Sequence, residues 1–119
     1  MMSHALHDAV SLEIARRIAE GLPAHPEWLT LARSNLERWS QLNAGAPALL
    51  HCYQEWRTLL ERPIQEIAAT LLATTERSQG LRQNSPFAGA LTPAEVWQIK
   101  RRIHETTAPS TISAQGVAT

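Results

Sequence analysis

Proline and glycine divide this chain into short segments, and within each segment the apolar residues repeat with the period of an α-helix. The first segment, residues 3–20, has an apolar residue at every fourth position: Leu6, Val10, Ile14 and Ile18. Gly21 then acts as a helix stop, and Pro23 prevents the helix from resuming. No stretch of the chain alternates apolar and polar residues as a half-buried strand would.

The remaining segments predict four or five more helices. Three prolines stand where a helix would begin, since the missing N–H would be unpaired there in any case: Pro26, Pro47 and Pro63. Thr74 or Thr75 is expected to cap a short helix that reaches residue 82. With 119 residues, 44% of them hydrophobic, the chain can bury one core without a metal or disulfide. The sequence therefore predicts a single all-α domain over residues 1–105, a compact bundle of five or six short helices.

Residues 81–97 contain more residues that restrict the backbone conformation than any other stretch of the chain. Asn84 and Ser85 are expected to hydrogen-bond to the nearby backbone, and Pro86 fixes one backbone angle. Gly89 is expected to supply a positive φ angle or room for close packing. So many constraints in one stretch predict a rigid surface rather than a slack linker.

The clearest helix start follows at Thr92. Thr92-Pro93-Ala94-Glu95 is a capping box with proline at the first helical position. The apolar surface of this last helix is expected to comprise four residues: Val96, Trp97, Ile99 and Ile103. The basic run 100–102 lies near its C-terminus, where positive charge favours the helix dipole.

Residues 106–119 differ from the rest in composition. Thr, Ser, Ala, Gly and Pro dominate, and Ile112 and Val117 are the larger apolar side chains. Such a segment buries too little surface to offset the entropy of ordering, so it is expected to be a flexible C-terminal tail.

Composition also limits the class of partner. Eleven basic residues balance eleven acidic ones, whereas a dedicated nucleic-acid binder normally has a basic excess. The single Cys52 can form no internal disulfide, which suits a reducing compartment. No signal-peptide pattern is visible, and no apolar run approaches the ~18 residues of a membrane span. We therefore expect a cytoplasmic protein with no membrane partner.

No motif predicts catalysis or metal binding. His4 and His7 lie on neighbouring helical turns, but no further histidine is spaced to complete a metal site. Ser85 lacks the Gly-x-Ser-x-Gly elbow of serine hydrolases. An enzyme of unknown class, the least favoured hypothesis, would have to use a few scattered groups: His7, Asp8, His51 and Ser85. We predict no catalytic residue, no metal and no cofactor.

Tryptophan and arginine favour a binding role, because both are enriched at protein–protein hot spots. Four tryptophans are many for 119 residues, and Trp28, in the first turn of its helix, is the best candidate for an exposed anchor. Arginines on the central helices suit bidentate docking of a carboxylate or phosphate. The predicted partner contacts are Trp28, Arg33, Arg38, Arg82, Asn84, Ser85, Phe87 and Lys100. The expected partner is another protein, and a second copy of the chain would also satisfy the pattern.

Four places in the chain carry a family resemblance: Leu6–Val10, Ala32–Trp39 (Ala-Arg-Ser-Asn-Leu-Glu-Arg-Trp), Glu55-Trp56 with Leu59-Leu60, and Leu81–Trp97 with its Ser-Pro-Phe-Ala-Gly run. In these places the chain resembles a family of small uncharacterised bacterial proteins. The resemblance covers about residues 6–103. The family's association with toxin–antitoxin gene pairs implies an antitoxin-like protein that occludes its partner, with a nucleotidyltransferase-type toxin encoded nearby as the partner class. The resemblance implies no catalytic residue.

A DNA-binding regulator is the second hypothesis. It would use the basic residues at the end of the last helix to contact phosphates: Lys100, Arg101 and Arg102. Three charges at a helix end more often complement the helix dipole, so we rank DNA binding below protein binding.

Overall fold

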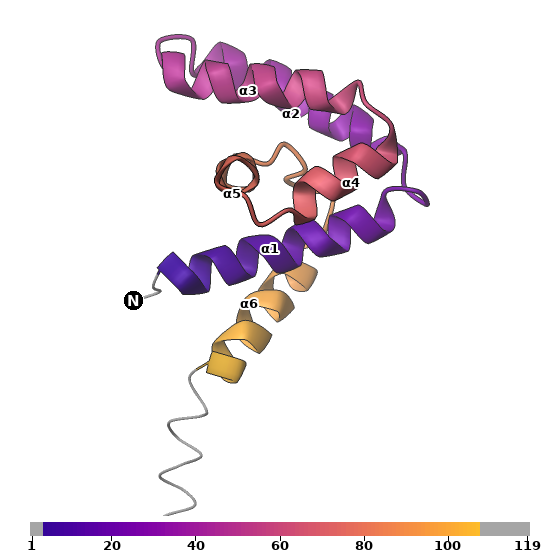
Figure 1. Cartoon of the computed structure of the whole chain (residues 1–119), viewed down its shortest axis with the longest axis vertical. Coiled ribbons are helices and arrows are strands. Elements are labelled where there is room, and N and C mark those ends of the chain that lie inside the picture. Colours follow the sequence, from indigo (N-terminus) through magenta and orange to yellow (C-terminus); the bar gives the residue numbers. More distant parts are fainter. Residues whose placement is uncertain (1–3, 108–119) are drawn as a thin grey trace, which may run out of the picture.

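The computed structural model describes residues 4–107, which form six helices (Figure 1). They are α1 (His4–Gly21), α2 (Glu27–Leu42), α3 (Pro47–Leu60), α4 (Ile64–Leu72), α5 (Glu76–Gln83) and α6 (Pro93–Thr107). The described residues contain no strand, so the prediction of an all-α fold is confirmed. The last helix runs two residues past the predicted domain boundary at 105, and the rest of the predicted tail, 108–119, lies outside the described residues.

The helices are arranged around the short helix α5. α2 and α3 form an antiparallel pair, and α1 packs against α4, α5 and α6 (Figure 1). α4 touches α3 on one side and α1 on the other. α5 and the segment that follows it therefore lie between the α2–α3 pair and α1.

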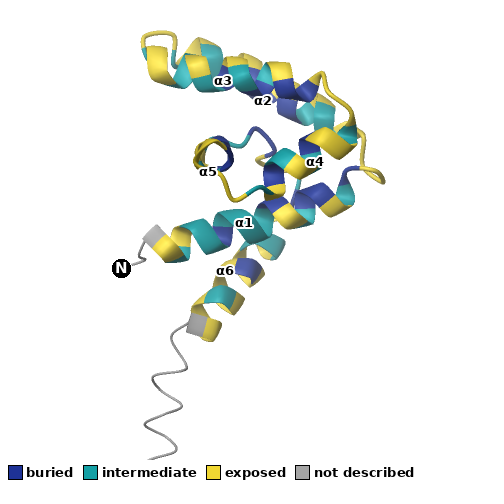
Figure 2. Cartoon of the chain, viewed as in Figure 1, coloured by how far each residue is buried: buried dark blue, intermediate teal, exposed yellow. Residues whose placement is uncertain are grey.

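The predicted apolar stripes supply most of the core (Figure 2). Ile18, Leu36 and Ile67 are at most 2% exposed, and the largest fully buried side chains are Trp56 and Phe87. The expectation that Trp97 belongs to the apolar surface of the last helix was wrong, since Trp97 is 63% exposed. α6 packs mainly against α1, so only one side of α6 is covered.

Local capping chemistry agrees closely with the sequence. Thr92 N–H donates to Glu95 Oε1 at 2.9 Å, and Glu95 N–H donates to Thr92 Oγ1 at 3.1 Å, which completes the predicted capping box. Thr75 Oγ1 accepts a hydrogen bond from Ser78 N–H at 3.1 Å at the start of α5. Gly89 has φ +95°, the left-handed conformation that glycine adopts without strain.

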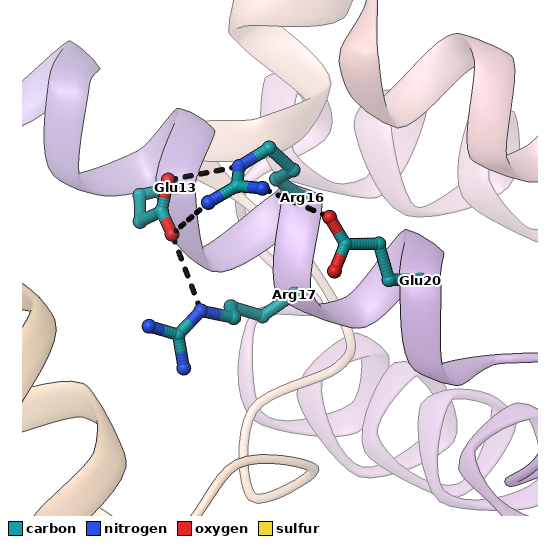
Figure 3. Close-up of polar contacts among 4 residues, drawn as sticks. All are labelled: Glu13, Arg16, Arg17 and Glu20. Carbon is teal, nitrogen blue, oxygen red and sulfur yellow. Dashed lines mark hydrogen bonds and ion pairs between the residues drawn. The ribbon is translucent and has the colours of Figure 1, made fainter.

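The exposed side of α1 carries a network of two arginines and two glutamates (Figure 3). Arg16 donates two hydrogen bonds to Glu13, at 3.0 and 2.6 Å, and one to Glu20 at 2.9 Å. Arg17 donates to the same Glu13 at 3.2 Å. The Arg16 hydrogen bonds are the largest cause that lowers the pKa of Glu13.

Candidate functional site

The segment between α5 and α6 is held by side chains from distant helices. Asn35 of α2 is buried, and its Nδ2 donates to the carbonyl oxygens of Pro86 at 2.8 Å and Ala88 at 3.0 Å. The Phe87 ring meets the Trp56 ring edge-on, with centroids 5.9 Å apart and an interplanar angle of 80°. These contacts fix the shape of the 84–89 turn.

The end of α5 is tied to α3 and α4. Trp56 Nε1 donates to the Leu81 carbonyl oxygen at 2.9 Å. Arg82 Nη1 donates to the carbonyl oxygens of Leu71 at 2.9 Å and Ala73 at 2.6 Å. Arg82 therefore satisfies acceptors at the C-terminus of α4, where a positive charge also favours the helix dipole.

A cleft of about 320 Å³ opens between α1 and the 84–89 turn; we call it the α1–turn cleft. It is lined by Ser11, Ile14, Ala15, Ile18, Arg82, Gln83, Ser85, Phe87, Ala88, Gly89 and Val96. The walls are mostly apolar, and the polar groups belong to α1, the end of α5 and the turn. This combination is typical of small-ligand sites.

A second concave surface also borders the turn. A groove of about 560 Å³ is lined by Gly89, Leu91, Thr92, Pro93, Val96, Trp97 and Lys100. Trp97 also borders a hollow along α6 with Lys100, Arg101 and His104, which lie three, four and seven positions further along the helix. We call these four residues the Trp97 face. The groove and the α1–turn cleft share Gly89 and Val96.

Two residues that were predicted to be surface contacts are buried. Phe87 is 2% exposed and packs on Trp56, so it is a core residue rather than a surface contact. Arg82 is 8% exposed and caps α4. Ser85 is half-buried beside them, and its Oγ lies 3.4 Å from the Phe87 nitrogen that donates to it.

The other predicted residues are spread over the molecule. Trp28 is half-buried and stacked on His25, with ring centroids 4.5 Å apart, so it is not the freely exposed anchor that its position predicted. Arg33 is exposed and donates to the Leu60 carbonyl at 3.3 Å, which ties α2 to α3. Arg38 is exposed and donates to Asn35 Oδ1 at 2.7 Å.

Asn84 and Lys100 lie on different surfaces. Asn84 is half-buried at the end of α5 and borders a small hollow next to Trp39 and Tyr53. Lys100 is exposed beside Trp97. The structure thus gathers Arg82, Ser85 and Phe87 around one cleft and leaves Lys100 on the neighbouring groove.

Sequence reasoning missed the roles of two residues, the buried hydrogen-bond donor Asn35 and the exposed Trp97. Asn35 lies on the buried stripe of α2 between Ala32 and Leu36, and a polar residue at such a position indicates a buried hydrogen bond. Trp97 is one position after Val96 and so points about 100° away from it around the helix. The i, i+3, i+4 and i+7 spacing of the Trp97 face was the pattern that could have shown its exposure.

His51, one of the groups that an enzyme would use, and its neighbour Cys52 lie on α3. His51 is largely exposed, and its Nε2 lies 3.6 Å from Glu55 Oε1. Burial is the main cause that raises the pKa of the Cys52 thiol, which disfavours the reactive thiolate. Across residues 4–107, no three His, Cys, Asp or Glu side chains are grouped to hold a metal ion. Among the described helices, none combines the length and apolar character that a bilayer crossing requires.

Comparisons of the chain with protein-family models, with curated proteins and with solved structures gave no match. The family resemblance therefore stays a prediction.

Proposed function

We propose that this chain is a non-catalytic protein-binding module and that the Trp97 face is its main contact surface. The observation that carries the proposal is the 63% exposure of Trp97. Tryptophan is enriched among the buried anchors of protein interfaces, and here it borders a groove in the molecular surface. The groove beside it offers further apolar area from Leu91 and Pro93.

The charges around Trp97 favour an acidic partner. Residues 100–102 carry three positive charges, of which Arg101 is paired with Glu105 at 3.2 Å. Lys100 and Arg102 take part in none of the ion pairs found across residues 4–107. We expect a partner that offers an apolar pocket for the indole with carboxylates around its rim.

In its specific form, the proposal is an antitoxin role in the bacterial cytoplasm, as the family resemblance implies. The chain would cover the active site of a toxin encoded nearby, of the nucleotidyltransferase type, and neutralise it by occlusion. Occlusion needs a rigid surface, and the hydrogen bonds from Asn35 to the 84–89 turn supply rigidity next to the Trp97 face.

Co-purification with the product of the neighbouring gene tests the proposal. We expect capture by the full chain and a loss of at least about tenfold in affinity for Trp97→Ala, since a hot-spot residue is worth about 2 kcal/mol or more. Gln98→Ala is the matched control, because Gln98 is also exposed on α6. Growth on co-expression with the toxin tests the antitoxin role. No capture together with no rescue of growth would refute the proposal.

DNA binding is the alternative outcome. Lys100, Arg101 and Arg102 are consecutive, so they spread over about 200° of α6 instead of forming one basic side. A promoter fragment that is shifted by the chain at low salt, and is released when these residues are neutralised, would favour this alternative.

A further inference from the structure

We infer that the α1–turn cleft binds a small monocarboxylate with an apolar body, held through the Arg82 guanidinium. This inference does not depend on the proposed function, because Trp97 does not line the cleft. It rests on the size of the cleft, the character of its walls and the electrostatic state of Arg82.

The size of the cleft limits the ligand. Its volume of about 320 Å³ is at the lower end of the range for small-molecule sites, about 300–1,000 Å³. Liquid water occupies about 30 Å³ per molecule, so the cleft has room for a ligand of about ten non-hydrogen atoms.

The walls divide by character. The apolar lining comes from Ile14 and Ile18 of α1, Phe87 of the turn and Val96 of α6. Ile18 and Phe87 are only 2% exposed, so Ile14 and Val96 offer more of the accessible apolar surface. Four residues supply the polar groups: Ser11, Arg82, Gln83 and Ser85. A ligand with one polar end and an apolar body matches both sets.

Arg82 supplies the charge that defines the polar end of the ligand. It is 8% exposed, and none of the ion pairs found across residues 4–107 includes it. A buried charge without a counter-ion is costly, and the recorded partners of Arg82 are two backbone carbonyls, not a carboxylate. A carboxylate in the cleft would provide the missing counter-ion.

The guanidinium also has donors to spare. Both recorded hydrogen bonds of Arg82 use Nη1, whereas a guanidinium carries five N–H donors on three nitrogens. Within residues 4–107, no fully buried side-chain nitrogen or oxygen lacks a hydrogen-bond partner, so Nε and Nη2 of Arg82, which no recorded hydrogen bond uses, are not fully enclosed. Arg82 is one of the residues that line this cleft.

A matched pair of probes tests the inference on the full chain. Phenylacetate and phenylacetamide have the same shape and number of heavy atoms, but only the first is charged. In an NMR titration of backbone amides, we expect phenylacetate to shift Ser11, Ser85 and Val96 and to bind at least about tenfold more tightly than phenylacetamide, since its hydrogen bonds are charge-assisted. Equal binding of the two probes, no binding, or shifts that leave these residues unchanged would overturn the inference.

Two variants sharpen the test. Ala88→Phe places a ring at the rim of the cleft while keeping the backbone carbonyl that Asn35 uses, so binding should be lost. Ala48→Phe, at an exposed position on α3 outside the cleft, should bind as the wild type does. Arg82→Gln should abolish the preference for phenylacetate. If circular dichroism shows that Arg82→Gln is unfolded, the wild-type preference and Ala88→Phe decide the matter, and persistent binding by Ala88→Phe contradicts the inference.

Discussion

The side-chain nitrogen of Asn35 donates a buried hydrogen bond to the carbonyl oxygen of Pro86 at 2.8 Å, although the two residues are 51 positions apart in the chain. The same nitrogen donates to the Ala88 carbonyl at 3.0 Å, and the Asn35 oxygen accepts from Arg38 at 2.7 Å. The amide is thereby fixed in one orientation. Asn35 connects α2 to the turn that borders both concave surfaces.

Asn35→Ala should lower the free energy of unfolding by about 2–4 kcal/mol, because two backbone carbonyls lose their donor inside the protein. Ser34→Ala removes a hydroxyl from the neighbouring exposed position and should change stability by no more than about 0.5 kcal/mol. Urea denaturation followed by circular dichroism measures both. Equal stability of the two variants would mean that the Asn35 hydrogen bonds contribute nothing net.

Two aromatic residues of the same segment should lose very different amounts of stability on truncation. Phe87→Ala should cost about 3–5 kcal/mol of stability, since Phe87 is 2% exposed and packs on Trp56. Trp97→Ala should cost less than about 1 kcal/mol, because Trp97 is 63% exposed. Thermal unfolding of the isolated chain compares the two. A large loss for Trp97→Ala would show that the indole is buried in solution.

Gly21 and Gly80 lie in helices and should differ in the sign of their response to alanine. A Cβ at Gly21 would lie 2.6 Å from two ring carbons of Trp28, so Gly21→Ala should destabilise the fold by about 1–3 kcal/mol. A Cβ at Gly80 meets nothing within 4 Å, so Gly80→Ala should stabilise the fold by about 0.5–1 kcal/mol. In a Trp28→Ala background, the cost of Gly21→Ala should disappear, which a double-mutant cycle measures.

Acid should weaken the fold in part through Glu13. The hydrogen bonds from Arg16 lower the pKa of this carboxyl below its ordinary value of 4.5, so the unfolded chain takes up the proton more readily than the folded one. Glu13 therefore stabilises the fold above pH 4.5, and this contribution is lost as the pH falls through the lowered pKa. Glu13→Gln should be less stable than the wild type at neutral pH, and the difference should shrink below pH 4.5. Glu61→Gln removes the same charge outside the recorded ion pairs and should show no such convergence.

The sequence predicted best the features that a few neighbouring residues decide. The Thr92–Glu95 capping box, the Thr75 cap and the positive φ of Gly89 all depend on local chemistry, and all three are confirmed. Helix starts at prolines were right to within one residue, since Pro47 opens α3 and Pro63 immediately precedes α4.

Burial was harder to predict, because it depends on which helix covers which side. α6 packs mainly against α1, so the stripe through Val96 and Ile99 is covered while Trp97 faces solvent. Arg82 and Phe87 looked like surface contacts because their partners, the end of α4 and the Trp56 ring, are distant in sequence. No local pattern of residues reveals a cleft whose walls come from α1, α5 and α6.

The Trp56 indole N–H and the Leu71 carbonyl find their partners in Leu81 and Arg82, which come later in the chain. A nascent chain that ends before Leu81 contains the first four helices, but its Trp56 N–H and Leu71 carbonyl lack these hydrogen-bond partners. The Trp56 ring also lacks its contact with the Phe87 ring. Native packing of the first four helices therefore waits for residues that the ribosome adds afterwards.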